Sequence, residues 1–257
     1  MPSAASATEQ LGALEVSVQR LASLVNGMKL EQLNQQAYPS KWSVADVLSH
    51  LGSGAVIMQR GIDAAVSGHP VEEGFRQSVW DEWNAKGAAA RAADALTADR
   101  KLLDSVASLT DAQRDSFHYA FGPFQADLAT FLGLRLNEHV LHSWDIDVAL
   151  HPTATLPPDA VAIVIDNLEM IAGFAGKSDG HERDLTVHTT EPSRAFTVKV
   201  DPERLALTPA APSAPVDLEL PSEAFVRLVY GRLDPDHAPP DIESPELEQL
   251  RGLFPGL

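Results

Sequence analysis

The chain has 257 residues, 44% of them hydrophobic, and it carries 36 acidic against 19 basic side chains, a net charge of −17. Phosphate backbones and anionic membrane surfaces attract basic proteins, so this acidity argues against both partners. Cysteine is absent, which excludes disulfides, thiolate-bound zinc, iron–sulfur clusters and a cysteine nucleophile, so that any thiol chemistry needs a thiol brought in from outside.

The N-terminal segment MPSAASATEQ has neither the basic start nor the apolar core of a signal peptide. The longest apolar runs, such as DAVAIVI at 159–165, are far shorter than the roughly 20 residues that a membrane helix needs. These observations predict a cytoplasmic protein that does not contact a membrane.

Helical patterns fill the first 150 residues, because apolar side chains recur there every three or four positions. Ser43 precedes one such pattern and is a good N-cap, with Asp46 three residues later in the first turn. The predicted helices span residues 8–26, 43–67, 81–107 and 124–150, with loops predicted at 71–80 and 109–123. Four helices of this length predict a helix bundle.

The pattern changes after residue 151, where His151-Pro152 and Leu156-Pro157-Pro158 mark a boundary. Apolar and polar residues then alternate in several short stretches, which is typical of half-buried strands. We predict strands at 184–191, 194–201, 204–210 and 216–221, helices at 158–174 and 221–231, and an irregular tail at 234–246. The chain is therefore predicted to be α+β, with a four-helix bundle over 1–151 and a smaller α+β domain over 152–257.

Glu138 and His142 are four residues apart in the last predicted helix of the bundle. Four steps of about 100° bring two side chains onto one helix face, one turn apart. Zinc accepts imidazole nitrogen and carboxylate oxygen, and three protein ligands with one open position are typical of a catalytic site. His50, in another predicted helix, is the candidate for the third ligand.

The spacing leaves alternatives open, because Glu and His four residues apart also occur as solvated helix pairs. His139 is a competing ligand, although it points about 100° away from Glu138. Asp145 lies on nearly the same face and could orient a ligand imidazole, or it could be a surface carboxylate. His118 is a candidate for the border of the site. Trp42 and Trp144 are predicted to pack in the core.

Three segments resemble one family over essentially the whole chain. KWSVADVLSHL (41–51) and RLNEHVLHSWDIDVAL (135–150) are similar to the metal-binding segments of the mycothiol-dependent maleylpyruvate isomerase-like proteins, which belong to the DinB-like metal-binding four-helix superfamily. LPSEAFVRLVYGRLDPD (220–236) resembles the end of their C-terminal α+β domain. The resemblance implies that His50, Glu138 and His142 bind a divalent metal.

The same resemblance implies mycothiol, the actinobacterial low-molecular-weight thiol, as cosubstrate, and a small maleylpyruvate-like electrophile as substrate. Zinc is the preferred metal, although nickel, iron or manganese would accept the same ligands. Maleylpyruvate is a dianion, so Arg135 and the family-like Arg232 are candidate catalytic residues, each with an exposed-surface role as the alternative.

The predicted function is thus a mycothiol-dependent isomerase or thiol S-transferase. A metal-dependent hydrolase or detoxifying enzyme on the same scaffold, and a non-catalytic ligand-binding module, stay open as alternatives. The protein is expected to be a monomer or a homodimer.

Overall fold

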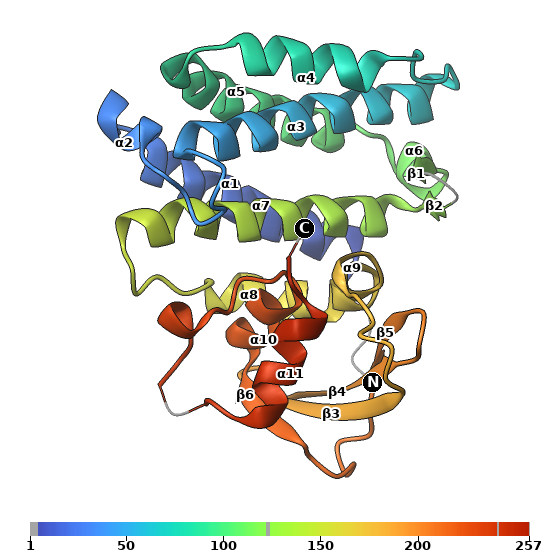
Figure 1. Ribbon diagram of the computed structural model, residues 1–257. Helices are drawn as coiled ribbons and strands as arrows, with labels where there is room; N and C mark the ends of the chain where they lie inside the picture. Colours follow the sequence, from blue (N-terminus) through green and yellow to red (C-terminus); the bar gives the residue numbers. More distant parts are fainter. Residues whose placement is uncertain (1–4, 122–123, 241, 257) are drawn as a thin grey trace. The chain divides into compact units, whose positions relative to one another are not determined.

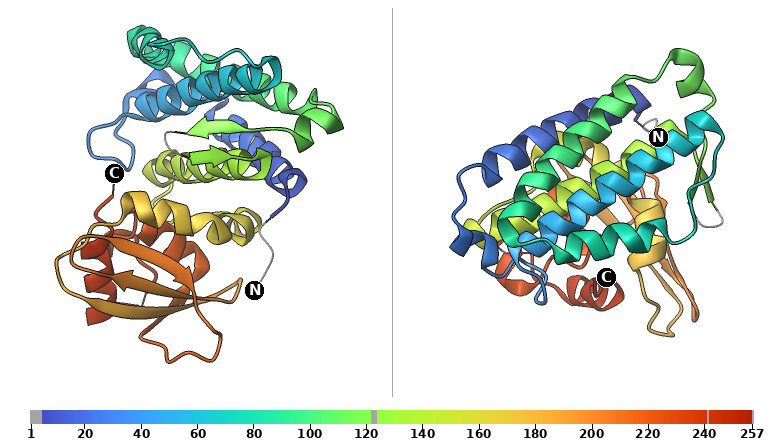
Figure 2. Two further views of the ribbon diagram at one scale, coloured as in Figure 1. Left: turned by 90° about the vertical axis from the view of Figure 1, so that its right-hand side faces the viewer. Right: turned by 90° about the horizontal axis from the view of Figure 1, so that it is seen from above.

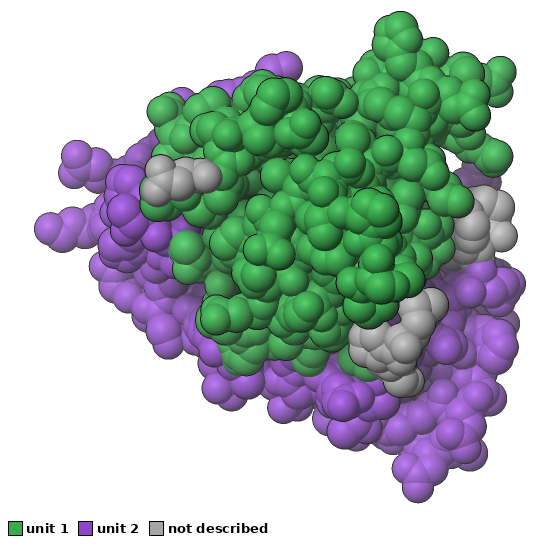
Figure 3. Space-filling view, turned by 90° about the horizontal axis from the view of Figure 1, so that it is seen from below, with its two compact units in different colours: residues 1–5, 155–257 green, residues 6–154 purple. Residues whose placement is uncertain are grey.

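The structure is a computed structural model that describes residues 5–121, 124–240 and 242–256 (Figure 1). The chain divides into two compact units, one formed by residues 6–154 and the other by the described part of residues 1–5 and 155–257 (Figure 3). Long helices make up the first unit, and the second contains a four-stranded sheet. The predicted α+β class is therefore confirmed, while the division into domains at 151/152 stays a prediction.

Four long helices lie side by side in the first unit, as Figure 1 and the right-hand view of Figure 2 show. They are α1 (Ala7–Val25), α3 (Val44–Ser67), α5 (Ala88–Ala107) and α7 (Leu128–Leu150). Both α1 and α3 pack against α5 and α7, so the four helices close a ring. Leucines that are at most 1% exposed fill its centre, among them Leu14, Leu48, Leu102 and Leu136.

Side-chain caps set where the two helices with the predicted ligands begin. The Ser43 Oγ accepts a hydrogen bond from the Asp46 backbone N–H at 3.2 Å, and the Asp46 carboxylate accepts one from the Ser43 N–H at 2.9 Å. This reciprocal pair caps α3. The Asp127 carboxylate caps α7 by accepting from the Thr130 N–H at 2.8 Å. The caps therefore determine the residues at which α3 and α7 start.

The region between α3 and α5 differs from the prediction. Residues 75–80, predicted as loop, and 81–85, predicted as the start of one long helix, form a separate helix, α4 (Phe75–Ala85). Gly74 precedes it with φ +78°, a left-handed conformation that glycine adopts without strain. Lys86 is extended and Gly87 is the N-cap of α5, so the Ala-rich pattern is interrupted by backbone geometry that periodicity does not show.

The other connections of the first unit contain short elements that the sequence did not predict. They are α2 (Leu30–Asn34), α6 (Asp111–Asp115), β1 (Tyr119–Phe121) and β2 (Phe124–Ala126). The strands β1 and β2 pair in antiparallel fashion, with Tyr119 opposite Ala126. Helix α7 therefore begins at Leu128 and not at residue 124, because residues 124–126 hydrogen-bond to another strand.

The second unit is built on a four-stranded sheet with the order β5-β4-β3-β6, in which only the β3–β6 pair is parallel. The helices α9 and α10 contact its strands. Its strands are β3 (Arg183–Thr190), β4 (Arg194–Val200), β5 (Leu205–Pro209) and β6 (Leu218–Pro221). Its helices are α8 (Pro158–Val164), η1 (Ile165–Asn167), α9 (Leu168–Ala175), α10 (Ser222–Val229), η2 (Pro235–His237) and α11 (Pro245–Leu253).

Two predictions for this unit were wrong in detail. The helix expected over 158–174 is interrupted by the short turn η1, and α11 begins inside the predicted irregular tail. Ser244 caps α11 by accepting from the Leu247 N–H at 3.2 Å, and Pro245 occupies its first position. In the described part of the chain, no helix is both long enough and apolar enough to cross a bilayer.

Candidate metal centre

Donor atoms from two helices converge in the first unit. The Glu138 Oε2 lies 3.1 Å from the His50 Nε2 and 3.5 Å from the His142 Nε2, and the three donor atoms all lie within 4.8 Å of one another. Nitrogen and oxygen donors at about 2.0–2.1 Å from a tetrahedral zinc are about 3.4 Å apart. The three side chains therefore fit one divalent ion.

The three ligands are open to solvent to different degrees. The side chains of His50 and Glu138 are 39% and 38% exposed, whereas that of His142 is 12% exposed. A structural metal site is usually closed by four protein ligands, while a catalytic one keeps a position for water or substrate. Three protein donors with this exposure leave access for an incoming ligand.

Asp145 determines which nitrogen of His142 carries the proton. Its carboxylate is 0% exposed and lies 2.7 Å from the His142 Nδ1. The ring donates its Nδ1–H to this carboxylate, which leaves Nε2, on the side of Glu138, as the nitrogen that can bind a metal. Carboxylates commonly orient metal-binding histidines in this way. The structure thus places Asp145 beside the ligand set and not on the surface.

The pKa values within the cluster are shifted in opposite directions. Burial alone would raise the pKa of Glu138, but the imidazoles of His142 and His50 outweigh it and hold this pKa well below its usual value. Burial, helped by the charges of His142 and Arg135, lowers the pKa of His50, and Glu138 only partly offsets this effect. For His142, burial acts against the carboxylates of Asp145 and Glu138, which together raise its pKa. Glu138 is therefore a carboxylate at neutral pH.

Trp42 forms an aromatic wall beside both histidines. Its ring centroid is 5.3 Å from that of His50 and 5.9 Å from that of His142, and it stacks on the latter ring at an interplanar angle of 26°. Periodicity could not show this, because Trp42 lies outside α3, at the end of a turn in which its N–H donates to the Pro39 carbonyl at 2.9 Å. Trp144, by contrast, packs in the core against Tyr38 and donates to the Ala154 carbonyl at 2.9 Å.

Two further polar residues of α7, Arg135 and His139, bind Asp99 and are not among the three converging donors. Arg135 is 3% exposed and donates to Asp99 and, at 2.9 Å, to the Leu51 carbonyl. His139 is 0% exposed and also lies against Asp99, so it does not share the cluster of donors. A direct contact of Arg135 with substrate stays a prediction, and its burial favours a role through Asp99 and α3 instead.

The remaining candidates lie elsewhere. Arg232 belongs to the other unit, where it is 8% exposed and donates to the Tyr230 carbonyl at 2.8 Å. His118 is exposed, and its Nδ1 lies 2.9 Å from the Ser116 carbonyl. That Arg232 binds substrate, and that His118 borders the site, both stay predictions.

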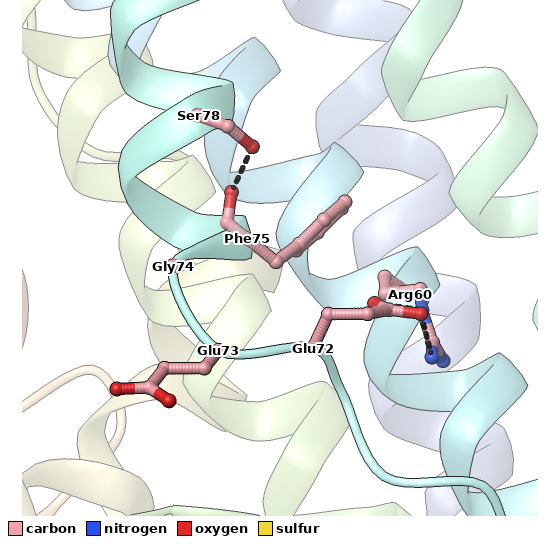
Figure 4. A pocket seen from close by; sticks show the side chains of 6 residues that line it. All are labelled: Arg60, Glu72, Glu73, Gly74, Phe75 and Ser78. Atoms are coloured by element: carbon pink, nitrogen blue, oxygen red, sulfur yellow. Dashed lines mark hydrogen bonds and ion pairs between the residues drawn. The ribbon is translucent and has the colours of Figure 1, made fainter.

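An open depression of about 450 Å³ lies where α3 and α4 meet (Figure 4). Arg60 in its wall binds the Glu72 carboxylate at 2.9 and 3.0 Å and the Pro70 carbonyl at 3.0 Å. None of the three converging ligands lines this depression, which is therefore not part of the candidate metal centre.

Comparisons with known proteins identify a family and a similar fold. A family model described as the mycothiol maleylpyruvate isomerase N-terminal domain matches residues 14–147. The fold is similar to the crystal structures of the mycothiol-dependent maleylpyruvate isomerase and of a histidine-to-alanine mutant of that enzyme. Each has a TM-score of 0.66 at 15% identity, covering 94% of this chain and 96% of the other. No curated protein matches the chain in sequence.

The matched segment covers just over half of the chain and includes His50, Glu138 and His142. The two solved structures, at 15% identity, concern the fold alone. The family model and the fold together lead to one assignment: the chain belongs to the mycothiol maleylpyruvate isomerase N-terminal domain family.

Proposed function

We propose that the protein is a metalloenzyme that uses mycothiol as cosubstrate, and that it isomerises a small maleylpyruvate-like electrophile or transfers the thiol to one. The observation that carries this proposal is the convergence of His50, Glu138 and His142 on one point, in a chain of this family. Zinc is the proposed ion because two imidazoles and one carboxylate form a typical catalytic zinc ligand set.

The residues around this point have distinct proposed roles. A divalent cation with an open position lowers the pKa of a protic ligand such as a thiol. Glu138, ionised at neutral pH, supplies negative charge to the ligand set, and Asp145 holds the His142 proton on Nδ1. Trp42 lies beside both rings and supports their orientation. The chain has no cysteine, so the thiol must come from outside.

Isomerisation and S-transfer share their first bond-forming step and differ in whether the thiol is returned or consumed. When the thiol sulfur adds to an activated double bond, that bond becomes single and can rotate. Expulsion of the thiol then gives the trans isomer and returns the cosubstrate, whereas S-transfer consumes one thiol for each product. Arg232 stays a proposed cation for a substrate carboxylate.

Metal content tests the ligand assignment. Wild-type protein should bind about one equivalent of zinc, and His142→Ala should lose most of it. His151→Ala is the matched control, because His151 follows the same helix and pairs with Asp147 at the surface. Retention of a full equivalent by His142→Ala would refute the assignment.

Turnover tests the proposed reaction. The zinc-loaded wild type is incubated with mycothiol and a panel of electrophiles that includes maleylpyruvate, and both thiol and product are followed by NMR. Isomerised product with unchanged thiol supports isomerisation, and loss of thiol supports S-transfer. A zinc-loaded protein that hydrolyses a substrate without thiol would support the hydrolase alternative. A protein that binds zinc but turns over no substrate would support the non-catalytic alternative.

A further inference from the structure

A buried polar cluster outside the metal centre joins all four bundle helices. Asp99 on α5 is 1% exposed and accepts hydrogen bonds from Arg135 and His139, which lie one turn apart on α7. The His139 Nδ1 lies 2.8 Å from the Ser17 Oγ on α1. Arg135 also donates to the Leu51 carbonyl on α3 at 2.9 Å.

The Arg135 guanidinium lies where the two ligand-bearing helices meet. Leu51 directly follows His50 on α3, and Arg135 precedes Glu138 by three residues on α7. The Arg135 side chain of α7 is thus hydrogen-bonded to the backbone of α3 directly beside the ligand His50. Gly54 leaves room for it, because a Cβ there would lie 3.1 Å from the Arg135 Nη1.

We propose that Asp99 is a positioning residue for the metal centre. Through Arg135 it holds α3 and α7 at the separation that brings His50 to the ion bound by Glu138 and His142. The inference rests on the proposed metal centre.

The physical cost of this cluster supports a positional role. Burying an ion pair costs several kcal/mol of desolvation, and apolar side chains of similar volume often stabilise a core as well or better. Within the described residues, the buried Arg135 Nε also has no hydrogen-bond partner. What a carboxylate and a guanidinium add is a directional contact with one preferred geometry. Metal ligands need this, because their distances tolerate only about ±0.2 Å.

The test of the proposal is the zinc affinity of Asp99→Asn. It is measured on the full chain by competition with a chromophoric chelator. We expect a loss of about 10- to 100-fold, as for other residues that orient metal ligands. The absorption spectrum of the cobalt-loaded protein should also change, since it reports ligand geometry directly. Val106→Ala is the control, because Val106 is buried on the same helix about two turns away from Asp99, and its truncation destabilises the bundle. It should keep wild-type affinity and spectrum.

The outcomes separate this inference from the proposed function. A wild type that binds no zinc refutes the metal centre and the inference with it. A wild type that binds zinc while Asp99→Asn binds equally well, with an unchanged cobalt spectrum, overturns the inference alone. Should Asp99→Asn fail to fold, Arg135→Lys decides: it keeps the charge beside Asp99 but cannot reach the Leu51 carbonyl as well. Wild-type affinity in Arg135→Lys would then overturn the inference.

Discussion

At the scale of single residues, the proton on His142 decides whether this ring can bind a cation. Nε2 offers a lone pair only while Nδ1 carries the proton, and the buried Asp145 carboxylate stabilises that tautomer. The sequence placed Asp145 near the right helix face but left a surface role open. Its burial and its 2.7 Å contact with His142 follow from the packing around α7.

Asp145→Asn should weaken zinc binding. The amide can no longer hold the Nδ1 proton through a charged acceptor, so a loss of about 10- to 100-fold in affinity is expected. Asp147→Asn is the control, because Asp147 lies on the same helix and pairs with His151 at the surface. Competition with a chromophoric chelator measures both variants, and an equal loss in the two would contradict an orienting role for Asp145.

Because of Asp99, the free energy of unfolding should fall at acidic pH. Burial raises the pKa of Asp99, but Arg135 and His139 outweigh it, so the folded-state pKa lies below the unfolded-state value. The stabilisation is therefore present above the unfolded pKa and is lost as the pH falls through the folded one. Asp99→Asn should cost about 3–5 kcal/mol of unfolding free energy at pH 7. Measured by urea unfolding, the difference in unfolding free energy between Asp99→Asn and wild type should be smaller below about pH 4 than at pH 7. A difference that does not change with pH would contradict this account.

At the scale of elements, the sequence predicted which segments are helical better than it predicted where each helix begins and ends. Apolar periodicity identified α1, α3 and α7 because it records which face each helix buries. The break between α4 and α5 was not predicted, because the two extended residues that form it, Lys86 and Gly87, lie within an alanine-rich stretch typical of one helix. The start of α7 is delayed because β2 pairs with β1, and apolar periodicity does not indicate such short strands of three residues each.

The packing of α3 against α4 and α5 depends on one glycine. A Cβ at Gly52 would lie 2.1 Å from the Trp83 ring and 2.9 Å from the Ala95 Cα. Gly52→Ala should therefore destabilise the protein by about 1–3 kcal/mol through overpacking. Gly12→Ala in α1 is the control, since its added methyl group meets nothing within 4 Å and should stabilise by about 0.5–1 kcal/mol. Urea denaturation measures both, and a stabilised Gly52→Ala would show that Trp83 moves aside without cost.

At the scale of the whole molecule, the metal should stabilise the folded chain. A ligand that binds only the folded state adds about 2.7 kcal/mol at a free concentration of 100 times its Kd. Zinc should raise the Tm of the wild type but not that of His50→Ala, in which one of the three donors is removed. Calorimetry measures the Tm of both proteins with zinc, with magnesium and with added chelator. An equal shift for His50→Ala would mean that zinc binds elsewhere.

The sequence by itself determined what local geometry controls. Composition excluded cysteine chemistry, periodicity indicated four helices and an α+β class, and the four-residue spacing placed Glu138 and His142 on one face. His50 was a candidate from its helix and was implied as a ligand by the family resemblance. These conclusions need only the helix repeat and residue chemistry, which act over a few neighbouring positions.

Only the tertiary structure decided how side chains from different helices meet. His50 and Glu138 are 88 positions apart in sequence, yet their donor atoms lie 3.1 Å apart. The helix repeat put Arg135 near the ligand face, but the buried Asp99 of α5 binds its guanidinium within the bundle. Trp42 reached both imidazoles through the shape of its turn. Such contacts arise when whole helices bury their apolar faces together, and no local repeat records which partner each side chain finds.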